Sequence, residues 1–216
     1  MGLLQLLLPD ACAGCGRYGD LLCAACEGGL KRASTAADRF AAADPGIVVG
    51  DAMELAMAAF MHEGTARRVL QRLKYGGAGR LAVPLARAAT PTLRALLAQS
   101  GQAPLVPVPV HAARRRQRGY NQAELLAAEM GRLAGLPVVN LLERHRPTVR
   151  QHGLGRAARL RNLRGAIGLC PEARVPSVAI LVDDILTTSA TLEACAETLR
   201  RHGASRVFGL AVAREA

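Results

Sequence analysis

Two adjacent carboxylates followed by hydroxyl side chains are the residues of this chain best suited to chemistry. Asp183 and Asp184 come directly after an apolar run at 178–182, and a hydroxyl-rich segment follows them: Thr187, Thr188, Ser189 and Thr191. Neighbouring carboxylates repel each other unless they meet hydrogen-bond donors or a cation, and ribose hydroxyls with Mg²⁺ would meet that need. Hydroxyl groups and the backbone amides of a helix start, here including the amide of Ala190, hold phosphate. The combination predicts a site for a ribose 5-phosphate.

The elements around the acidic pair must place it at the edge of a sheet. The run Val178–Val182 is uniformly apolar, which is typical of a strand buried on both faces. A helix is predicted over Thr191–His202, closed by Gly203. Ligands of open α/β sheets bind beyond the carboxyl ends of the strands. A strand end that is merely capped by Asp and Thr is the alternative, and the flanking strand and helix favour the ligand site.

A second group of candidate anion contacts lies in the middle of the chain. The segment Val106-Pro107-Val108-Pro109 predicts an irregular strand within Leu105–Val110, and a basic turn containing Arg114, Arg118 and Gly119 follows. A helix is predicted over Gln122–Leu133. Because guanidinium groups pair bidentately with phosphate oxygens, this turn is predicted to contact pyrophosphate. A solvated basic turn is the alternative.

Lys74 is a further candidate contact for pyrophosphate. It lies at the end of an amphipathic helix predicted over Thr65–Tyr75, which glycines terminate at positions 76, 77 and 79. The alternative is that Lys74 only complements the negative end of that helix.

Four of the six cysteines form a predicted metal site. Cys12, Cys15, Cys23 and Cys26 make two Cys-x-x-Cys pairs separated by seven residues. Each pair presents two thiolates to one ion, and two pairs complete a tetrahedral shell for structural zinc. A segment this short cannot build its own core, so we expect metal binding to supply its folding energy. Disulfides are a weaker alternative because no export signal is visible.

The net charge is +11, and it is unevenly distributed. Residues 111–164 carry 12 Arg and 3 Glu, a net charge of +9, while residues 165–216 carry a net charge of −1. A GC-rich genome would explain the preference for Arg over Lys but not this clustering, which suggests an anionic partner. No apolar run approaches the ~20 residues of a membrane span, and no secretion signal is visible. We therefore expect a cytoplasmic protein.

The remaining pattern predicts a parallel α/β sheet. A strand or short helix is expected at Met53–Met61, a helix at Leu81–Leu97 around Pro91, and a strand at Arg206–Val212. Apolar strands that alternate with helices favour a parallel sheet. We expect two domains: a zinc ribbon at 1–35 and a sheet domain at 50–216.

The acidic segment resembles the phosphoribosyl-pyrophosphate signature of type I phosphoribosyltransferases. The run Arg118-Gly119-Tyr120-Asn121-Gln122, the Lys74-Tyr75-Gly76 segment and the four-cysteine knuckle together resemble the ComF family, which joins a double zinc ribbon to such a domain. A looser pattern continues downstream at Gln151, Leu154, Arg159, Asn162 and Gly165, with Ala158 where an acidic residue is common.

The resemblance implies a type I phosphoribosyltransferase-like fold that binds phosphoribosyl pyrophosphate with Mg²⁺. Asp183 and Asp184 would contact the ribose, the loop from Thr187 to Thr191 would hold the 5-phosphate, and Arg118 would contact pyrophosphate. Arg159 would lie on a loop over the site. The family usually has Gly where this chain has Ser189, and a positive φ at Ser would cost roughly 1 kcal/mol.

Two functions follow from the resemblance. One is phosphoribosyl transfer to an unidentified acceptor, in the service of natural transformation and the handling of incoming single-stranded DNA with competence-machinery proteins. The other is a non-catalytic nucleic-acid-binding module that keeps the fold and the ligand for regulation.

Overall fold

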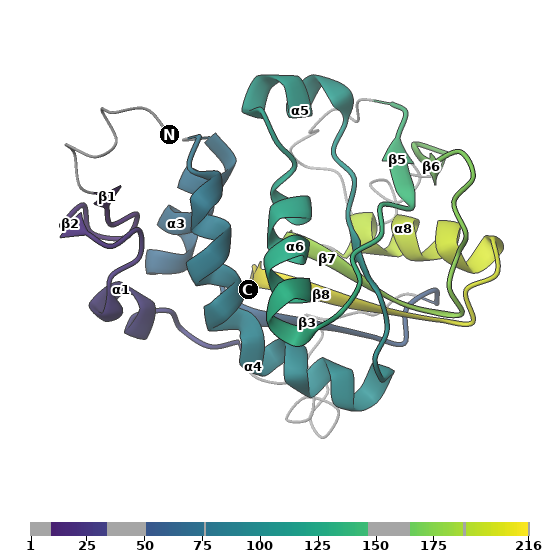
Figure 1. Ribbon diagram of the computed structural model, residues 1–216, viewed down its shortest axis with the longest axis horizontal. Helices are drawn as coiled ribbons and strands as arrows, with labels where there is room; N and C mark the ends of the chain where they lie inside the picture. The colour runs from purple at the N-terminus through teal and green to yellow at the C-terminus, as the bar shows by residue number, and fades with distance from the viewer. Residues whose placement is uncertain (1–9, 34–50, 76, 147–164, 188, 216) are drawn as a thin grey trace.

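The apolar run that precedes the acidic pair forms the centre of the fold. In the computed structural model, which describes residues 10–33, 51–75, 77–146, 165–187 and 189–215, this run is the first half of strand β7, Val178–Leu186 (Figure 1). The strand is longer than Val178–Val182, because pairing with its neighbour continues past the two aspartates to Leu186. Both acids therefore lie within the last part of a central strand rather than in the loop after it.

A four-stranded parallel sheet surrounds β7, as the alternating pattern predicted. Its order is β3-β8-β7-β4, with β3 at Leu55–Met61, β8 at Arg206–Arg214 and β4 at Leu105–Pro107. The ambiguous segment at 53–61 is thus a strand, and the strand predicted to reach Val110 ends at Pro107. Since all four strands run the same way, their carboxyl ends meet at one edge of the sheet.

Helices cover both faces of this sheet, which explains its uniformly apolar strands. One face packs against α4 (Ala82–Ser100) and α6 (Gln122–Ala134), and α3 (Gly64–Tyr75) joins the same core (Figure 1). The other face packs against α8, Ala190–Arg201. Helix α4 continues through Pro91 instead of ending there. The α/β fold with a parallel sheet flanked by helices is therefore confirmed.

Several elements were not predicted from the sequence. The basic segment expected to be a turn is the short helix α5, Ala112–Arg118, which ends at Gly119 with a φ of +83°. An antiparallel hairpin pairs β5 (Leu142–Arg144) with β6 (Ile167–Leu169) and contacts α8. A short 3₁₀ helix, η2 (Gly79–Leu81), connects α3 and α4.

The cysteine-rich segment packs on the same side as α3 and α4. It consists of β1 (Asp10–Ala11), β2 (Tyr18–Gly19) and α1 (Ala24–Gly28), and its apolar residues Leu22 and Leu30 join the core of those helices. We call residues 10–29 the knuckle. The chain then runs beside β3, where the Ala33 amide donates to the Ala59 carbonyl at 3.1 Å and the Met61 amide donates to the Lys31 carbonyl at 2.9 Å. The expected division into domains at 1–35 and 50–216 stays a prediction.

Among the described residues, no helix has the length and apolarity that spanning a bilayer requires.

Candidate functional site

The two aspartates at the carboxyl edge of the sheet have different surroundings. Successive side chains of a strand point to opposite faces. The Asp184 carboxylate faces α3, where its Oδ2 lies 2.8 Å from the Lys74 Nζ. The Asp183 carboxylate is directed to the other face, where its charge acts on Arg144 of β5 and Cys195 of α8. The pair is thus divided between two sides of one strand.

Burial sets the protonation behaviour of Asp183. Burial, followed by the nearby charge of Asp184, raises the pKa of the Asp183 carboxyl well above its ordinary value, and Lys74 opposes this increase only partly. The Asp183 Oδ1 accepts a hydrogen bond from the Asp184 amide at 2.8 Å. A divalent cation at this edge would favour the charged form of Asp183, since it would offset the repulsion between the two carboxylates.

The predicted phosphate loop connects β7 to α8 within a few residues. Thr187 is exposed, while Ser189 is buried and directly precedes Ala190, the first residue of α8. Ser189 has a φ of +56° and a ψ of −9°, so the serine holds a left-handed conformation that glycine adopts more readily. Thr191 is half-buried in the first turn of α8, and Thr188 lies outside the described residues. The loop therefore has the backbone shape expected of a tight turn into a helix.

The four cysteines of the knuckle fit a zinc ion. Their Sγ atoms all lie within 4.8 Å of one another, and the Cys15 and Cys23 Sγ atoms are 3.8 Å apart. A tetrahedral shell with Zn–S distances of about 2.3 Å puts its sulfur atoms roughly 3.8 Å apart. The amides of Gly14 and Cys23 both point at the Cys12 Sγ, at 3.4 Å. The predicted four-thiol cluster is confirmed, and its geometry is compatible with structural zinc.

Electrostatics within the cluster also suit a cation. Burial alone would raise the pKa of the Cys12 thiol, but amide hydrogen bonds from Cys23, Cys15 and Gly14 bring it down to about 6. Burial and then the neighbouring thiols raise the pKa of Cys26 to about 12. Crowding therefore prevents all four sulfurs from ionising together without a positive ion between them.

The segment from Arg118 to Gln122 makes hydrogen bonds to helix α3, to the chain that follows β4 and to the start of α6. The Tyr120 hydroxyl donates to the Leu73 carbonyl of α3, and the Asn121 Nδ2 donates to the Val108 carbonyl at 3.0 Å. The Asn121 side chain also caps α6 by accepting from the Ala123 amide at 3.0 Å. Asn121 is only 1% exposed, so this part of the motif supports the structure.

Arg118 has partners on this scaffold. Its Nη1 donates to the Gln122 Oε1 at 2.9 Å, and its guanidinium carbon lies 5.0 Å from the centre of the Tyr75 ring. Arg114 belongs to the same helix, and its charge lowers the pKa of Arg144, for which burial is the larger cause. Arg144 is thus affected by the charges of both Arg114 and Asp183.

Comparison with known proteins finds relatives that match about half of the chain. No family model matches. Competence protein F of Haemophilus influenzae is 37% identical over 116 residues, which are 50% of this chain and 49% of that protein. DNA utilization protein YhgH is 35% identical over 105 residues in Salmonella typhi and 34% identical over 104 residues in Escherichia coli K12, covering 48% of this chain and 45% of each relative. These relatives confirm the resemblance to the ComF family.

The chain spans about half the length of the curated relatives it matches. A solved structure of phosphoribosylpyrophosphate synthetase from Mycobacterium smegmatis aligns with a TM-score of 0.35 and 18% identity, over 60% of this chain and 33% of that one. The sheet order β3-β8-β7-β4 defines the fold independently of that alignment.

Several residues of the ComF-type pattern fall outside the described residues. These are Thr188 of the phosphate loop and the downstream positions Gln151, Leu154, Arg159 and Asn162. The expected roles of Thr188 and Arg159 stay predictions.

The sequence analysis missed His62, which lies at the same edge of the sheet. His62 directly follows β3, its amide donates to the Arg214 carbonyl, and its Nδ1 lies 3.8 Å from the Glu215 Oε1. Burial, followed by the charge of Lys74, lowers the pKa of the imidazole. Its position after a strand would have indicated the site if residues 55–61 had been identified as a strand.

Proposed function

We propose that this chain binds phosphoribosyl pyrophosphate with Mg²⁺ at the carboxyl edge of its sheet and acts as a phosphoribosyltransferase. The observation that carries the proposal is the succession of elements around the acidic pair. Asp183 and Asp184 lie in the last part of β7, which ends at Leu186, and Ser189 then turns the chain with a positive φ into α8. This order supplies carboxylates for ribose hydroxyls and backbone amides for the 5-phosphate within one connection.

Each residue of the site has a defined task in this proposal. The carboxylates of Asp183 and Asp184 accept hydrogen bonds from the ribose hydroxyls and orient the sugar. Thr187 and the amides around Ser189 and Ala190 hold the 5-phosphate. Lys74 is released from Asp184 when the ligand's hydroxyls take its place, and its ammonium then turns to the pyrophosphate.

The arginines complete the anion site in the proposal. Arg114 and Arg118 of α5, together with Thr188, Gly119 and Arg159, contact the phosphates. Mg²⁺, when bound, neutralises the departing pyrophosphate. The guanidinium groups add to this by stabilising negative charge as it develops on the leaving group. The acceptor would be a nitrogen nucleophile, as in the enzymes that the family resembles.

The four-cysteine cluster is proposed to bind one structural zinc ion. The cluster stabilises a knuckle that has few apolar residues of its own, because metal coordination supplies the folding energy that a small core cannot.

A role in DNA handling during natural transformation is the second part of the proposal. Its support is that the relatives bear the names Competence protein F and DNA utilization protein YhgH. The net charge of +9 over residues 111–164 also suits an anionic partner. If turnover is absent, the same observations favour a module that binds nucleic acid and uses phosphoribosyl pyrophosphate as a regulator.

Calorimetric titration with phosphoribosyl pyrophosphate and Mg²⁺ tests the ligand site. We expect heat of binding for the natural sequence and none for Asp183→Ala with Asp184→Ala at millimolar ligand. Asp51→Ala is the matched control, because Asp51 is exposed and precedes β3 at the opposite edge of the sheet. Equal heat in all three proteins would refute the site. Turnover is tested separately, by measuring the release of pyrophosphate with candidate acceptors.

A further inference from the structure

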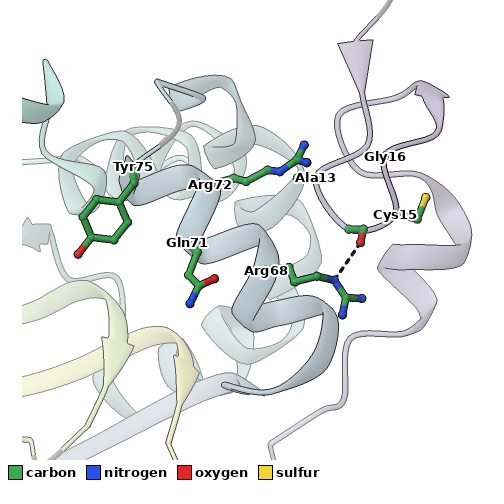
Figure 2. A pocket seen from close by; sticks show the side chains of 8 residues that line it. Ala13, Cys15, Gly16, Arg68, Gln71, Arg72 and Tyr75 are labelled. Carbon is green, nitrogen blue, oxygen red and sulfur yellow. Dashed lines mark hydrogen bonds between the residues drawn. The ribbon is translucent and has the colours of Figure 1, made fainter.

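A groove lies between the knuckle and helix α3. It has a volume of about 620 Å³. Four side chains of α3 and four residues of the knuckle line it (Figure 2): Arg68, Gln71, Arg72, Tyr75, Ala13, Gly14, Cys15 and Gly16. Residues from segments about 55 positions apart in sequence thus form one concave surface.

The four side chains from α3 form a stripe along one face of the helix. Their spacing of three, four and seven residues places them one above another on adjacent turns. The opposite face of the same helix is fully buried through Val69, Leu70 and Leu73. The polar stripe is therefore not needed for packing the helix on the sheet, and all four of its members are exposed.

The stripe is cationic. The Arg68 Nε donates to the Gly14 carbonyl at 2.9 Å, which holds the knuckle against the helix and fixes one guanidinium at the wall of the groove (Figure 2). Arg72 lies one turn further along and extends toward the knuckle (Figure 2). The described residues that line the groove include two arginines and neither Asp nor Glu, so their charged side chains are cationic, and Cys15 carries a negative charge only as a thiolate ligand of the proposed zinc ion.

An aromatic ring stands at the end of the stripe. Tyr75 is 62% exposed, and the guanidinium of Arg118 lies over its ring. A flat exposed ring beside guanidinium groups is the arrangement on which unpaired bases stack while the backbone phosphates meet arginine. The amide of Gln71, which also lines the groove, offers both donors and an acceptor to a base edge.

The arginine-rich block of the sequence has partners of its own. Arg115 pairs with Glu124 at 2.8 Å, and Arg132 pairs with Glu129 at 3.0 Å. Arg118 interacts with Gln122 and Tyr75. The block that made the charge distribution conspicuous is therefore partly neutralised by its own acidic neighbours, whereas the lining of the groove contains no acidic residue.

We propose that the groove between the knuckle and α3 binds single-stranded DNA, with a phosphate at Arg72 and a base on the Tyr75 ring. The inference rests on the proposed role in DNA handling, and it assigns that role to a surface that meets the phosphoribosyl pyrophosphate site only at Tyr75, where Arg118 lies over the ring. The knuckle supplies one wall of this surface, which gives the four-cysteine cluster a part in forming the groove.

Fluorescence anisotropy with a labelled oligothymidylate tests the proposal at several salt concentrations. We expect Tyr75→Ala to weaken binding about five- to 150-fold, as the loss of one stacked base would do, and Tyr75→Phe to bind like the natural sequence. Arg72→Ala should weaken binding and make the slope of log K against log salt shallower by about 0.7, because one phosphate contact is lost. An unlabelled duplex of the same length should compete poorly, since its bases are already stacked.

Two control variants distinguish this groove from the other basic surfaces of the chain. Arg94→Ala removes the same charge from an exposed position of α4 that does not line the groove, and Arg116→Ala removes it from α5. Both should bind the oligonucleotide normally. Unchanged binding by the Arg72 and Tyr75 variants would overturn the proposal, and so would weakening by Arg116→Ala alone. Equal competition by duplex, or no binding by the natural sequence, would also overturn it.

Calorimetry with phosphoribosyl pyrophosphate on the same variants distinguishes the two sites. The Arg72 variant should keep the heat of binding, which also shows that it is folded, and so should Tyr75→Phe, which keeps the ring beneath Arg118. Loss of oligonucleotide binding with this heat retained supports the groove. If the natural protein binds the oligonucleotide through Arg72 and Tyr75 but gives no heat with phosphoribosyl pyrophosphate, only the phosphoribosyl pyrophosphate site is refuted. The proposal for the groove is then still supported.

Discussion

The Nζ of Lys74 lies 2.8 Å from the Oδ2 of Asp184, and both side chains are largely buried. This ion pair joins the last turn of α3 to the end of β7. It brings the acidic pair of the predicted ribose site into contact with the residue that the sequence singled out as a candidate for pyrophosphate. The lysine thus closes the site on one side of the strand, and a ligand that engages Asp184 must compete with it.

Removal of Lys74 should destabilise the protein. Lys74→Met leaves the Asp184 carboxylate buried without its cation, which costs about 3–5 kcal/mol of the free energy of unfolding. Lys74→Met combined with Asp184→Leu removes both charges and should recover most of that loss. Urea denaturation at pH 7 measures both effects. Equal stability of the single variant and the natural sequence would show that the pair does not hold α3 against β7.

Asp183 should make the free energy of unfolding decrease as pH rises, which is the reverse of the usual effect of a carboxyl group. Its pKa is raised in the folded protein above the ordinary value of 3.8, so the folded state binds more protons than the unfolded state above pH 4. Its contribution to stability is therefore present below the unfolded pKa and decreases as pH rises through the folded pKa, by up to about 1.4 kcal/mol per pH unit.

Asp183→Asn removes this effect and provides the measurement. Compared with the natural sequence by urea denaturation, the variant should gain relative stability as pH rises from 4 to 7. Saturating Mg²⁺ should reduce the difference if the cation binds the carboxylates. Parallel pH profiles for the two proteins would contradict the raised pKa of Asp183.

Glycine at position 189 should stabilise the protein. Ser189 has a φ of +56°, a conformation in which a side chain costs about 1 kcal/mol relative to glycine. Ser189→Gly should therefore raise the free energy of unfolding by roughly that amount over Ser189→Ala, which loses the hydroxyl but keeps the steric cost. Thermal denaturation compares the two variants. A more stable alanine variant would show that the positive φ carries no cost at this turn.

Loss of a cysteine ligand should unfold the knuckle. We expect the purified chain to carry about one zinc ion, measured by atomic emission, and Cys26→Ser to lose it. Because zinc coordination contributes on the order of 10–16 kcal/mol in such sites, the amides of residues 10–29 should then exchange hydrogen at unprotected rates.

Cys170→Ser serves as the control, since Cys170 lies outside the cluster. It should keep both the metal and the protection of the knuckle. Full zinc content with a protected knuckle in Cys26→Ser would contradict the metal site.

Local chemistry made much of the fold predictable. The apolar run before Asp183 is typical of a strand covered on both faces, and the two Cys-x-x-Cys pairs favour a single metal ion over disulfides. The amphipathic spacing in α3 and α6 is equally local. Each of these features needs no more than the neighbouring residues to be recognised, and each is present in the structure.

Other features depended on the folded chain. Met53–Met61 is apolar enough for a helix or a strand, and pairing with β8 decides that it is a strand. Helix α5 was expected to be a turn because no local signal distinguishes a short helix from a loop in a run of arginines. The hairpin β5-β6 joins segments separated by residues 147–164, so its register comes from tertiary contacts.

By itself the sequence determined which groups are available: a carboxylate pair before a hydroxyl-rich loop, four thiols in two pairs, and a surplus of arginine. Tertiary structure alone decided which of them meet. It brought Lys74 to Asp184 and His62 to Glu215, and it opened a groove between the knuckle and α3. The physical reason is that strand order and helix packing, which bring together segments distant in the chain, depend on the burial of the whole apolar surface rather than on any local pattern.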